Sequence, residues 1–185
     1  IIVLLSTPKL FNHVNKIDEL NKTLKNQHGL IIKNTKKIEY KIFPQPNLEI
    51  KDALISLGKQ YPTIKIKELK IFINIKGLYV SEEIFFKKIK FKSNFLDNDI
   101  RGYYIPKENE NYLYLKVMNL GIESKVFLDN KNKLPKPSGL IKLKILDNNL
   151  LINFNYDKNL YLKNSTYKNK NIYTIFRGQF NFEPF

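Results

Sequence analysis

Cysteine is absent from this chain of 185 residues, and histidine is scarce. Without cysteine, disulfides and thiolate metal sites are excluded, while the redox compartment stays undecided. Its two histidines, His13 and His28, have no carboxylate or second histidine at metal-ligand spacing. A surface or helix-capping role is expected for each, and no metal or cofactor is predicted.

Glycine is also scarce. The seven glycines are isolated, so the chain has no glycine-rich phosphate loop. A Gly-x-Ser-x-Gly nucleophile elbow is missing as well. The acidic pair Glu82–Glu83 falls in a predicted break, where adjacent carboxylates are typical of solvated charges rather than of an acid and a base. These absences predict a protein that is not an enzyme.

The hydrophobic stretch at the N-terminus is too short to cross a membrane. Residues 1–5 are apolar, whereas a spanning helix needs about 20 such residues. One interpretation is a buried terminal strand. The other is the end of a membrane anchor or signal segment, residues 1–8, since residue 1 is not Met and we expect the sequence to belong to a longer chain.

Apolar residues and lysines dominate what is present. Hydrophobic residues make up 43% of the chain and aromatic residues 13%, which favours a packed fold over disorder. The formal net charge is +15, compatible with nucleic acid, anionic membranes or acidic proteins as partners. The lysines are spread along the predicted strands rather than clustered, and this distribution favours a solvated polar face.

Helical periodicity is confined to the N-terminal part. Thr7–Pro8 suits a helix start and His28–Gly29 suits a stop. Together with the apolar stripe, these signals predict an amphipathic helix over residues 9–29. The stripe, with residues three or four apart, consists of Phe11, Val14, Ile17, Leu20 and Leu24.

After Gly29 the apolar period changes to two, which indicates strands over residues 30–185. About ten strands joined by short turns form antiparallel meanders. The expected fold class is mainly β with one N-terminal amphipathic helix, in a single domain spanning residues 1–185. We expect the sheet to curl into an open, taco-like groove, with a β-sandwich as the alternative.

Two prolines interrupt this pattern early. Pro44 and Pro46 follow a short strand, and alternation resumes with Leu48 and Ile50. Because proline cannot donate a ladder hydrogen bond, it predicts a sharp strand end and a protected edge.

The position of the aromatic residues along the strands distinguishes a nucleic-acid ligand from an acyl-chain ligand. Phe91 alternates with Lys90 and Lys92, so ring and charge point to opposite faces of the predicted strand. Stacking of nucleic-acid bases needs both on one face, and no nucleic acid is therefore expected. The apolar face either packs into a sandwich core, which periodicity alone favours, or lines a trough for acyl chains.

The order of these features resembles the N-terminal region of the AsmA family. The matching pieces are residues 1–5, 11–20 and 28–32, then the strand–proline–strand element 38–54, and then 66–75, 78–83 and 89–91. The resemblance covers the first half of the chain, and the second half follows it only as a β meander.

This resemblance implies a periplasmic module anchored to the inner membrane by an N-terminal helix, similar to TamB-like bridge proteins. Its function would be phospholipid transfer and outer-membrane assembly, with phospholipid, the inner membrane, and outer-membrane or periplasmic proteins as partners. Acyl chains would lie in a hydrophobic β-groove without covalent chemistry. The alternative is a basic β-rich binding or scaffold module for an anionic polymer, either nucleic acid or polysaccharide.

Two sets of residues are expected to build this groove. The helix stripe of residues 11–24 would cap its membrane-proximal end. The groove itself would be lined by Ile71, Ile73, Ile75, Ile89, Phe91, Phe95, Ile152, Phe154, Phe176, Phe180 and Phe182.

Overall fold

A computed structural model describes residues 21–22, 24–26, 31–33, 37–41, 43–56, 63–73, 86–95, 97–129 and 136–181. Twelve strands are assigned to an antiparallel sheet, and helical residues are described at 21–22 and 24–26. The predicted mainly β, antiparallel fold is thus confirmed. The chain divides into two units, residues 1–93 and 94–185, and each is treated by itself below.

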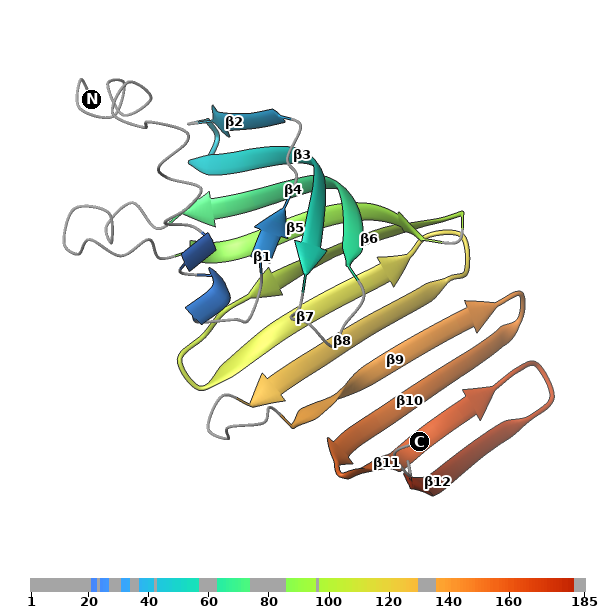
Figure 1. The fold of residues 1–185 in the computed structure, drawn as a ribbon. Helices are drawn as coiled ribbons and strands as arrows, with labels where there is room; N and C mark the ends of the chain where they lie inside the picture. Colours follow the sequence, from blue (N-terminus) through green and yellow to red (C-terminus); the bar gives the residue numbers. More distant parts are fainter. Residues whose placement is uncertain are drawn as a thin grey trace. The chain divides into compact units, whose positions relative to one another are not determined.

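The first unit is organised around β3. Its strands are β1 (Ile31–Lys33), β2 (Lys37–Lys41), β3 (Asn47–Ser56), β4 (Ile64–Ile73) and β5 (Phe86–Phe95). Both β1 and β2 pair with β3, which also pairs with β4, and β4 pairs with β5 (Figure 1). All four pairings are antiparallel.

The proline-rich segment forms the turn between β2 and β3. Lys41 is the last residue of β2 and pairs with Asn47, the first of β3. Between them, the peptide bond from Phe43 to Pro44 is cis. The carbonyl of Pro46 accepts a hydrogen bond from the amide of Ile73, at 3.2 Å. The predicted strand end at these prolines is therefore confirmed.

The buried core of the described chain lies in this first unit. Leu48, Ile71 and Ile89 are directly opposite one another across β3, β4 and β5, so they share a face. All buried apolar residues among those described fall between positions 24 and 89. They are Leu24, Ile32, Leu48, Ile50, Ala53, Ile66, Leu69, Ile71, Ile73, Phe86 and Ile89.

A polar clip joins the described helical residues to β1. The Asn21 side chain accepts a hydrogen bond from the Ile32 amide, at 2.9 Å, and donates one to the Ile32 carbonyl, at 3.1 Å. Leu24, one helical turn further on, is 1% exposed. Residues 21–22 and 24–26 are helical, as predicted, whereas residues 9–20, 23 and 27–29 of the predicted helix lie outside the described part of the chain.

The second unit is an uninterrupted meander. Its strands are β6 (Asn98–Ile105), β7 (Glu110–Val117), β8 (Ile122–Asp129), β9 (Pro137–Ile145), β10 (Asn148–Asp157), β11 (Asn159–Lys168) and β12 (Tyr173–Asn181). Each strand pairs with the next in antiparallel register. Within the described residues of this unit, these strands are the secondary-structure elements, and they form one layer (Figure 1).

A β-bulge bends this meander at β11. Relative to both neighbouring strands, β11 contains one extra residue near Asn164, whose φ is 47°. The fully buried Ser165 hydroxyl accepts a hydrogen bond from the Asn153 amide, at 3.1 Å, and donates to the Asn153 carbonyl, at 3.4 Å. This hydroxyl replaces the ladder hydrogen bonds that the bulge interrupts.

Gly121 in the turn after β7 gives a test of the meander. Its φ is +61°, and an added Cβ would lie 2.3 Å from the Lys144 carbonyl oxygen. We expect Gly121→Ala to lower the unfolding free energy by about 2–3 kcal/mol, from left-handed strain plus the displaced carbonyl. Urea denaturation measures this change.

Gly178→Ala is the matched control, because the nearest atom to its added Cβ is 3.5 Å away, an ordinary contact. Its unfolding free energy should stay within about 0.5 kcal/mol of the wild-type value. Equal effects of the two substitutions would contradict the turn geometry described here.

Candidate functional site

One face of the second unit carries no charged residue. Residues directly opposite one another in adjacent strands share a face, and alternate residues along a strand do too. The strand registers therefore place one set of paired residues on this apolar face. They are Ile100, Gly102, Tyr104, Asn111, Leu113, Leu115, Val117, Ile122, Ser124, Val126, Leu128, Pro137, Gly139, Ile141, Leu143, Ile145, Asn148, Leu150, Ile152, Phe154, Tyr156, Leu160, Leu162, Ser165, Tyr167, Thr174, Phe176, Gly178 and Phe180.

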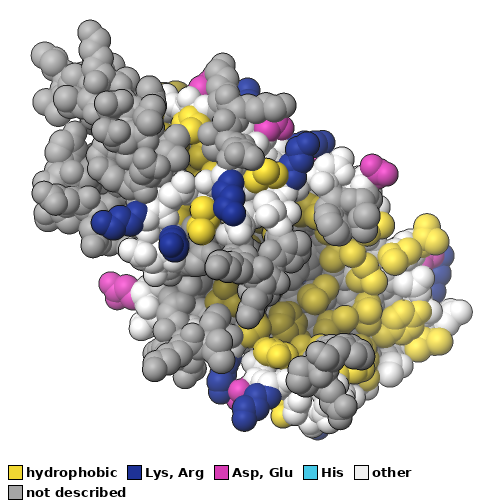
Figure 2. Space-filling model, viewed as in Figure 1, with side chains coloured by type: hydrophobic (Ala, Val, Ile, Leu, Met, Phe, Trp, Pro, Cys, Tyr) yellow, Lys and Arg dark blue, Asp and Glu magenta, His cyan; other side chains and the backbone are white. Residues whose placement is uncertain are grey.

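The apolar face remains accessible to solvent. None of its Ile, Leu, Val, Phe or Tyr side chains is buried, and Phe180 is 52% exposed. Figure 2 shows hydrophobic side chains gathered into a continuous patch over strands of this unit. Every buried apolar residue that the structure describes lies in the first unit, whereas the second unit presents its apolar side chains at a surface.

The apolar face extends over all seven strands of the second unit. The seven strands have eight to ten residues each. At ~3.3 Å per residue and ~4.8 Å between strands, they present a face on the order of 800 Å². The largest exposed apolar patch of a typical monomer is about 300–600 Å² and is often functional. We therefore take the apolar face as the candidate site.

Charges of the same strands lie on the opposite, polar face. Lys116 and Glu123 are opposite each other there and form an ion pair at 2.7 Å. Arg101 and Asp99 form a second pair at 2.8 Å. Because the period of a strand is two, each charged residue between apolar ones is turned away from the apolar face.

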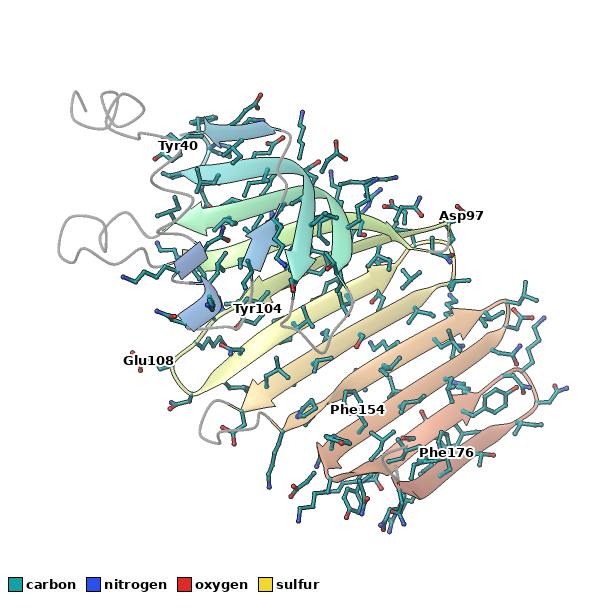
Figure 3. All side chains as sticks on the ribbon, viewed as in Figure 1. Tyr40, Asp97, Tyr104, Glu108, Phe154 and Phe176 are labelled. Carbon is teal, nitrogen blue, oxygen red and sulfur yellow. The ribbon has the colours of Figure 1, made fainter. Side chains whose placement is uncertain are left out.

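Four of the predicted groove residues are brought together on the apolar face. Ile152 and Phe154 lie on β10, and Phe176 and Phe180 on β12. Phe154 and Phe176 are labelled in Figure 3. These four residues share a face, and their role as the lining of a groove stays a prediction.

Other predicted groove residues lie elsewhere. Ile71, Ile73 and Ile89 are 0%, 4% and 6% exposed, so they fill the core of the first unit and line no open surface. Phe91 is half-buried beside Leu69. Three further residues cannot be placed, because the side chain of Phe95 and the whole of Ile75 and Phe182 lie outside the described part.

The predicted helix cap is represented by one residue. Leu24 is buried, as expected for the apolar side of the helix. The remaining members of the stripe, Phe11, Val14, Ile17 and Leu20, lie outside the described residues.

Most of the apolar face was missed by the predicted residue set. Examples are Leu113 and Leu115 on β7, and Val126 and Leu128 on β8. The alternation of apolar and polar residues was visible in the sequence, as in Ile141, Leu143 and Ile145. Periodicity does not show which apolar residues are buried in a core and which stay exposed. The residues of an exposed face therefore could not be selected from the sequence.

The polar side of the first unit holds a ladder of alternating charges. The Glu49 carboxylate is 3.3 Å from the Lys70 ammonium and 2.6 Å from that of Lys41. Lys70 continues to Glu68 at 3.0 Å, and Glu68 to Lys92 at 3.1 Å. Part of the large positive charge is thus compensated within the sheet.

The ladder shifts the pKa of its acidic members. The hydrogen bond from Lys41 is the main cause that holds the pKa of Glu49 below its usual value, with Lys70 adding to it. For Glu68, partial burial acts to raise the pKa, but hydrogen bonds from Lys70 and Lys92 outweigh it and the pKa is lowered.

Comparisons with known proteins found no similar protein. No family model, curated protein or solved structure matches this chain. Within the part that the structure describes, no group of three or more His, Cys, Asp or Glu side chains is placed to hold a metal ion. In the same residues, no helix combines the length and apolarity that a bilayer crossing requires. The candidate site therefore has to be interpreted from its own chemistry.

The ladder predicts a pH dependence of stability. Because the pKa of Glu49 is lower in the folded chain than its ordinary value of 4.5, its stabilisation is present above pH 4.5 and is lost as the pH falls through the folded pKa. We expect Glu49→Gln to lower the unfolding free energy by about 1–2 kcal/mol at pH 7. The loss should shrink in acid, when measured by urea denaturation at several pH values.

Glu39→Gln is the control, since its contact with Lys41 is longer, at 3.7 Å, and Glu39 is 32% exposed. A change within about 0.5 kcal/mol is expected for such an exposed pair. A Glu49→Gln effect that does not depend on pH between neutral and acid would contradict the assigned role of this carboxylate.

Proposed function

We propose that the apolar face of the second unit binds the acyl chains of phospholipids without covalent chemistry. The observation that carries this proposal is a charge-free face of seven strands in which no apolar side chain is buried. Covering such a surface with hydrocarbon removes it from water and is favourable by roughly 25 cal/mol per Å² of apolar area.

The chemistry of the face suits hydrocarbon better than a polar ligand. Branched aliphatic side chains from β7 to β10 form its centre, and no charged group lies among them. Apart from Ser124 and Ser165, the hydrogen-bonding groups of this face stand nearer the strand ends. There, the Tyr167 hydroxyl donates to Asn148 at 2.6 Å, next to the polar Thr174. Acyl chains would lie across the centre, and the headgroups would remain at the ends.

The biological setting of this binding is taken from the resemblance alone. The AsmA-like order of features in the first half of the chain motivates the proposal that the protein moves phospholipid in the periplasm from an inner-membrane anchor. In this proposal, the second unit holds the hydrocarbon and the first unit is the sealed, membrane-proximal part. Outer-membrane assembly would be the process that uses the transferred lipid.

Binding of an anionic polymer to the lysines is the weaker candidate. Lys41, Lys70 and Lys92 are engaged by carboxylates in the ladder of the first unit. A polyanion would have to compete with these pairs, whereas acyl chains would compete only with water at the apolar face. Retention on heparin that falls with salt would favour the polymer instead.

Phe154→Asp is the direct test of lipid binding. A carboxylate at the centre of the apolar face would have to be desolvated by the guest hydrocarbon, which is unfavourable unless the charge is paired. We expect at least about a tenfold loss of affinity for a phospholipid with a fluorescent acyl chain. Phe154 suits this test because it is half-exposed, unlike Ile73, where a carboxylate would disrupt the core.

Leu151→Asp is the matched control. Leu151 is the preceding neighbour of Ile152 on β10, but it lies opposite Lys142 on the polar face. This variant should bind the fluorescent lipid as the wild type does, with circular dichroism showing that both variants are folded. Unchanged binding by Phe154→Asp would overturn the proposed site, and so would an equal loss in the two variants.

A further inference from the structure

Three hairpin turns at one end of the second unit carry exposed apolar side chains. They join β7 to β8, β9 to β10 and β11 to β12, and they lie side by side at the same end of the strands (Figure 1). Each turn presents one large apolar side chain to solvent, and these apolar tips are Leu120, 48% exposed, Leu146, 87% exposed, and Ile172, 52% exposed. Hairpin turns ordinarily carry Asn, Asp, Gly or Ser instead. The apolar tips therefore form an unusual row along this end of the sheet.

Folding alone does not account for Leu146. The β9–β10 turn has two residues, since Ile145 pairs with Asn148, and Leu146 has a φ of 53°. This left-handed conformation favours Gly, Asn or Asp and is strained for leucine. Because the side chain is exposed, it gains almost no burial in return. A partner that covers the tip would supply that burial.

The hairpin ends behind the tips are basic. Residues 116–123, 142–149 and 166–175 contain five lysines and two carboxylates. Both carboxylates are already in ion pairs with lysines, at 2.7 and 2.8 Å. Of the other three lysines, Lys144 and Lys168 stand on either side of β10, close to the tips. The row of apolar tips is thus backed by an excess of positive charge.

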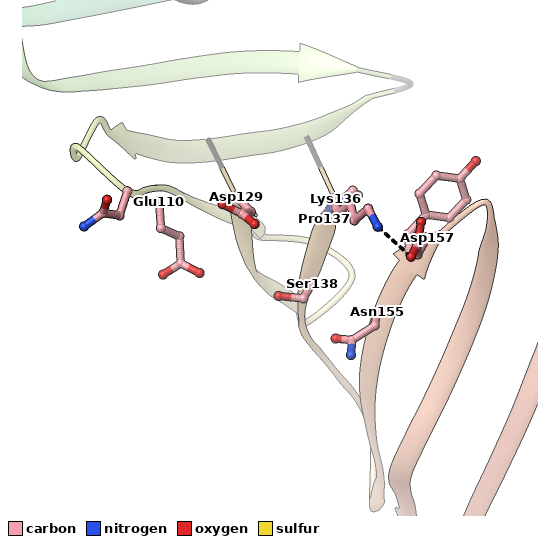
Figure 4. Close-up of a pocket in the computed structure, with 9 residues that line it drawn as sticks. Glu110, Asp129, Lys136, Pro137, Ser138, Asn155 and Asp157 are labelled. Atoms are coloured by element: carbon pink, nitrogen blue, oxygen red, sulfur yellow. Dashed lines mark hydrogen bonds and ion pairs between the residues drawn. The ribbon is translucent and has the colours of Figure 1, made fainter. Parts of the chain in front are cut away.

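The opposite end of the same strands has a different surface. Among the described residues, its turns at 106–109 and 158 contain proline, asparagine and charged residues. Charged side chains such as Glu110 and Lys136 line a pocket there, and Lys136 is paired with Asp157 at 2.7 Å (Figure 4). Within the described part of this unit, apolar turn tips therefore belong to one end, and a partner that covers them contacts the sheet end-on.

We infer that the apolar tips insert into the interface of a membrane that contains anionic phospholipid. The membrane would bury the three apolar side chains, which is favourable in proportion to their apolar area. Lysine side chains are long enough to keep their ammonium groups among the headgroup phosphates, which attract them. Tyr173, 63% exposed and next to Ile172, has the kind of amphipathic ring that is enriched at membrane interfaces.

Anionic lipid suits this end better than a second copy of the chain. Two such ends would bring lysines against lysines, which is unfavourable. The inference goes beyond the proposed function, because it concerns the turns alone. It requires neither acyl-chain binding by the apolar face nor an N-terminal anchor.

Leu146→Asn tests the inference without damage to the fold, because asparagine is favoured in the left-handed conformation. Its urea midpoint should equal or exceed that of the wild type. In co-sedimentation with vesicles of phosphatidylcholine and phosphatidylglycerol, its affinity should be about tenfold lower, through the loss of one buried leucine. Lys144→Gln should lower the same affinity about fivefold, through the loss of one charge at the anionic surface.

Lys158→Asn is the matched control. Lys158 is also exposed in a hairpin turn with a left-handed φ, of 63°, but it lies at the opposite end of the strands. This variant should bind the vesicles as the wild type does. Phe154→Asp, which tests the lipid site, should bind them as well, so that failure of one proposal is distinguished from failure of the other.

Insertion of the tips can be measured with a single dye, because the chain has no cysteine of its own. Leu120→Cys labelled with a polarity-sensitive fluorophore should emit at shorter wavelength when the vesicles are added, whereas labelled Lys158→Cys should not change. Unchanged emission at position 120 would overturn the inference, and so would wild-type affinity of Leu146→Asn. A wild-type dimer that Leu146→Asn dissociates in sedimentation velocity would also overturn it and assign the tips to a second copy.

Discussion

The two-residue period of the β-strand is the constraint on which both surfaces of the second unit depend. Charged residues occur in each of its strands, yet the registers turn all of them to one side. A slip of one residue in any pairing would move a lysine or carboxylate into the apolar face. Register is held by hairpin turns and by the bulge at Asn164, where the Ser165 hydroxyl substitutes for ladder hydrogen bonds.

The two units share the same alternating strand pattern but differ in the burial of its apolar residues. In the first, Ile71 and Ile89 are directly opposite each other and buried, as in an ordinary core. In the second, Ile141 and Ile152 are also directly opposite each other but remain half-exposed. Composition does not separate these pairs, since each joins two isoleucines in adjacent antiparallel strands. The two pairs differ in solvent exposure. Ile71 and Ile89 are buried by other parts of the protein, whereas Ile141 and Ile152 can contact a bound ligand.

Fold class was predictable because alternation, turns and prolines all act locally. Pro44 ended its strand as expected, and Leu24 confirmed the buried side of the helix. The change of apolar parity between Ile66 and Leu69 was visible in the sequence, and both residues are buried. It coincides with Asp52, whose φ is 51° and which lies between the paired residues Lys51 and Ala53 of β3. The stacking of Tyr103 on Tyr114 was not predictable, because the segment from Tyr112 to Leu115 is apolar or aromatic throughout and reveals no face.

The central claim is that the apolar face of the second unit, and not its polar face, contacts hydrocarbon. Paramagnetic broadening of methyl signals by a phospholipid with a nitroxide on its acyl chain measures that contact directly. The account predicts strong broadening for Leu113, Ile141 and Ile152 on the apolar face, and little for Leu140 and Leu151 on the polar face. Equal broadening of the two groups, or none in either, would contradict it.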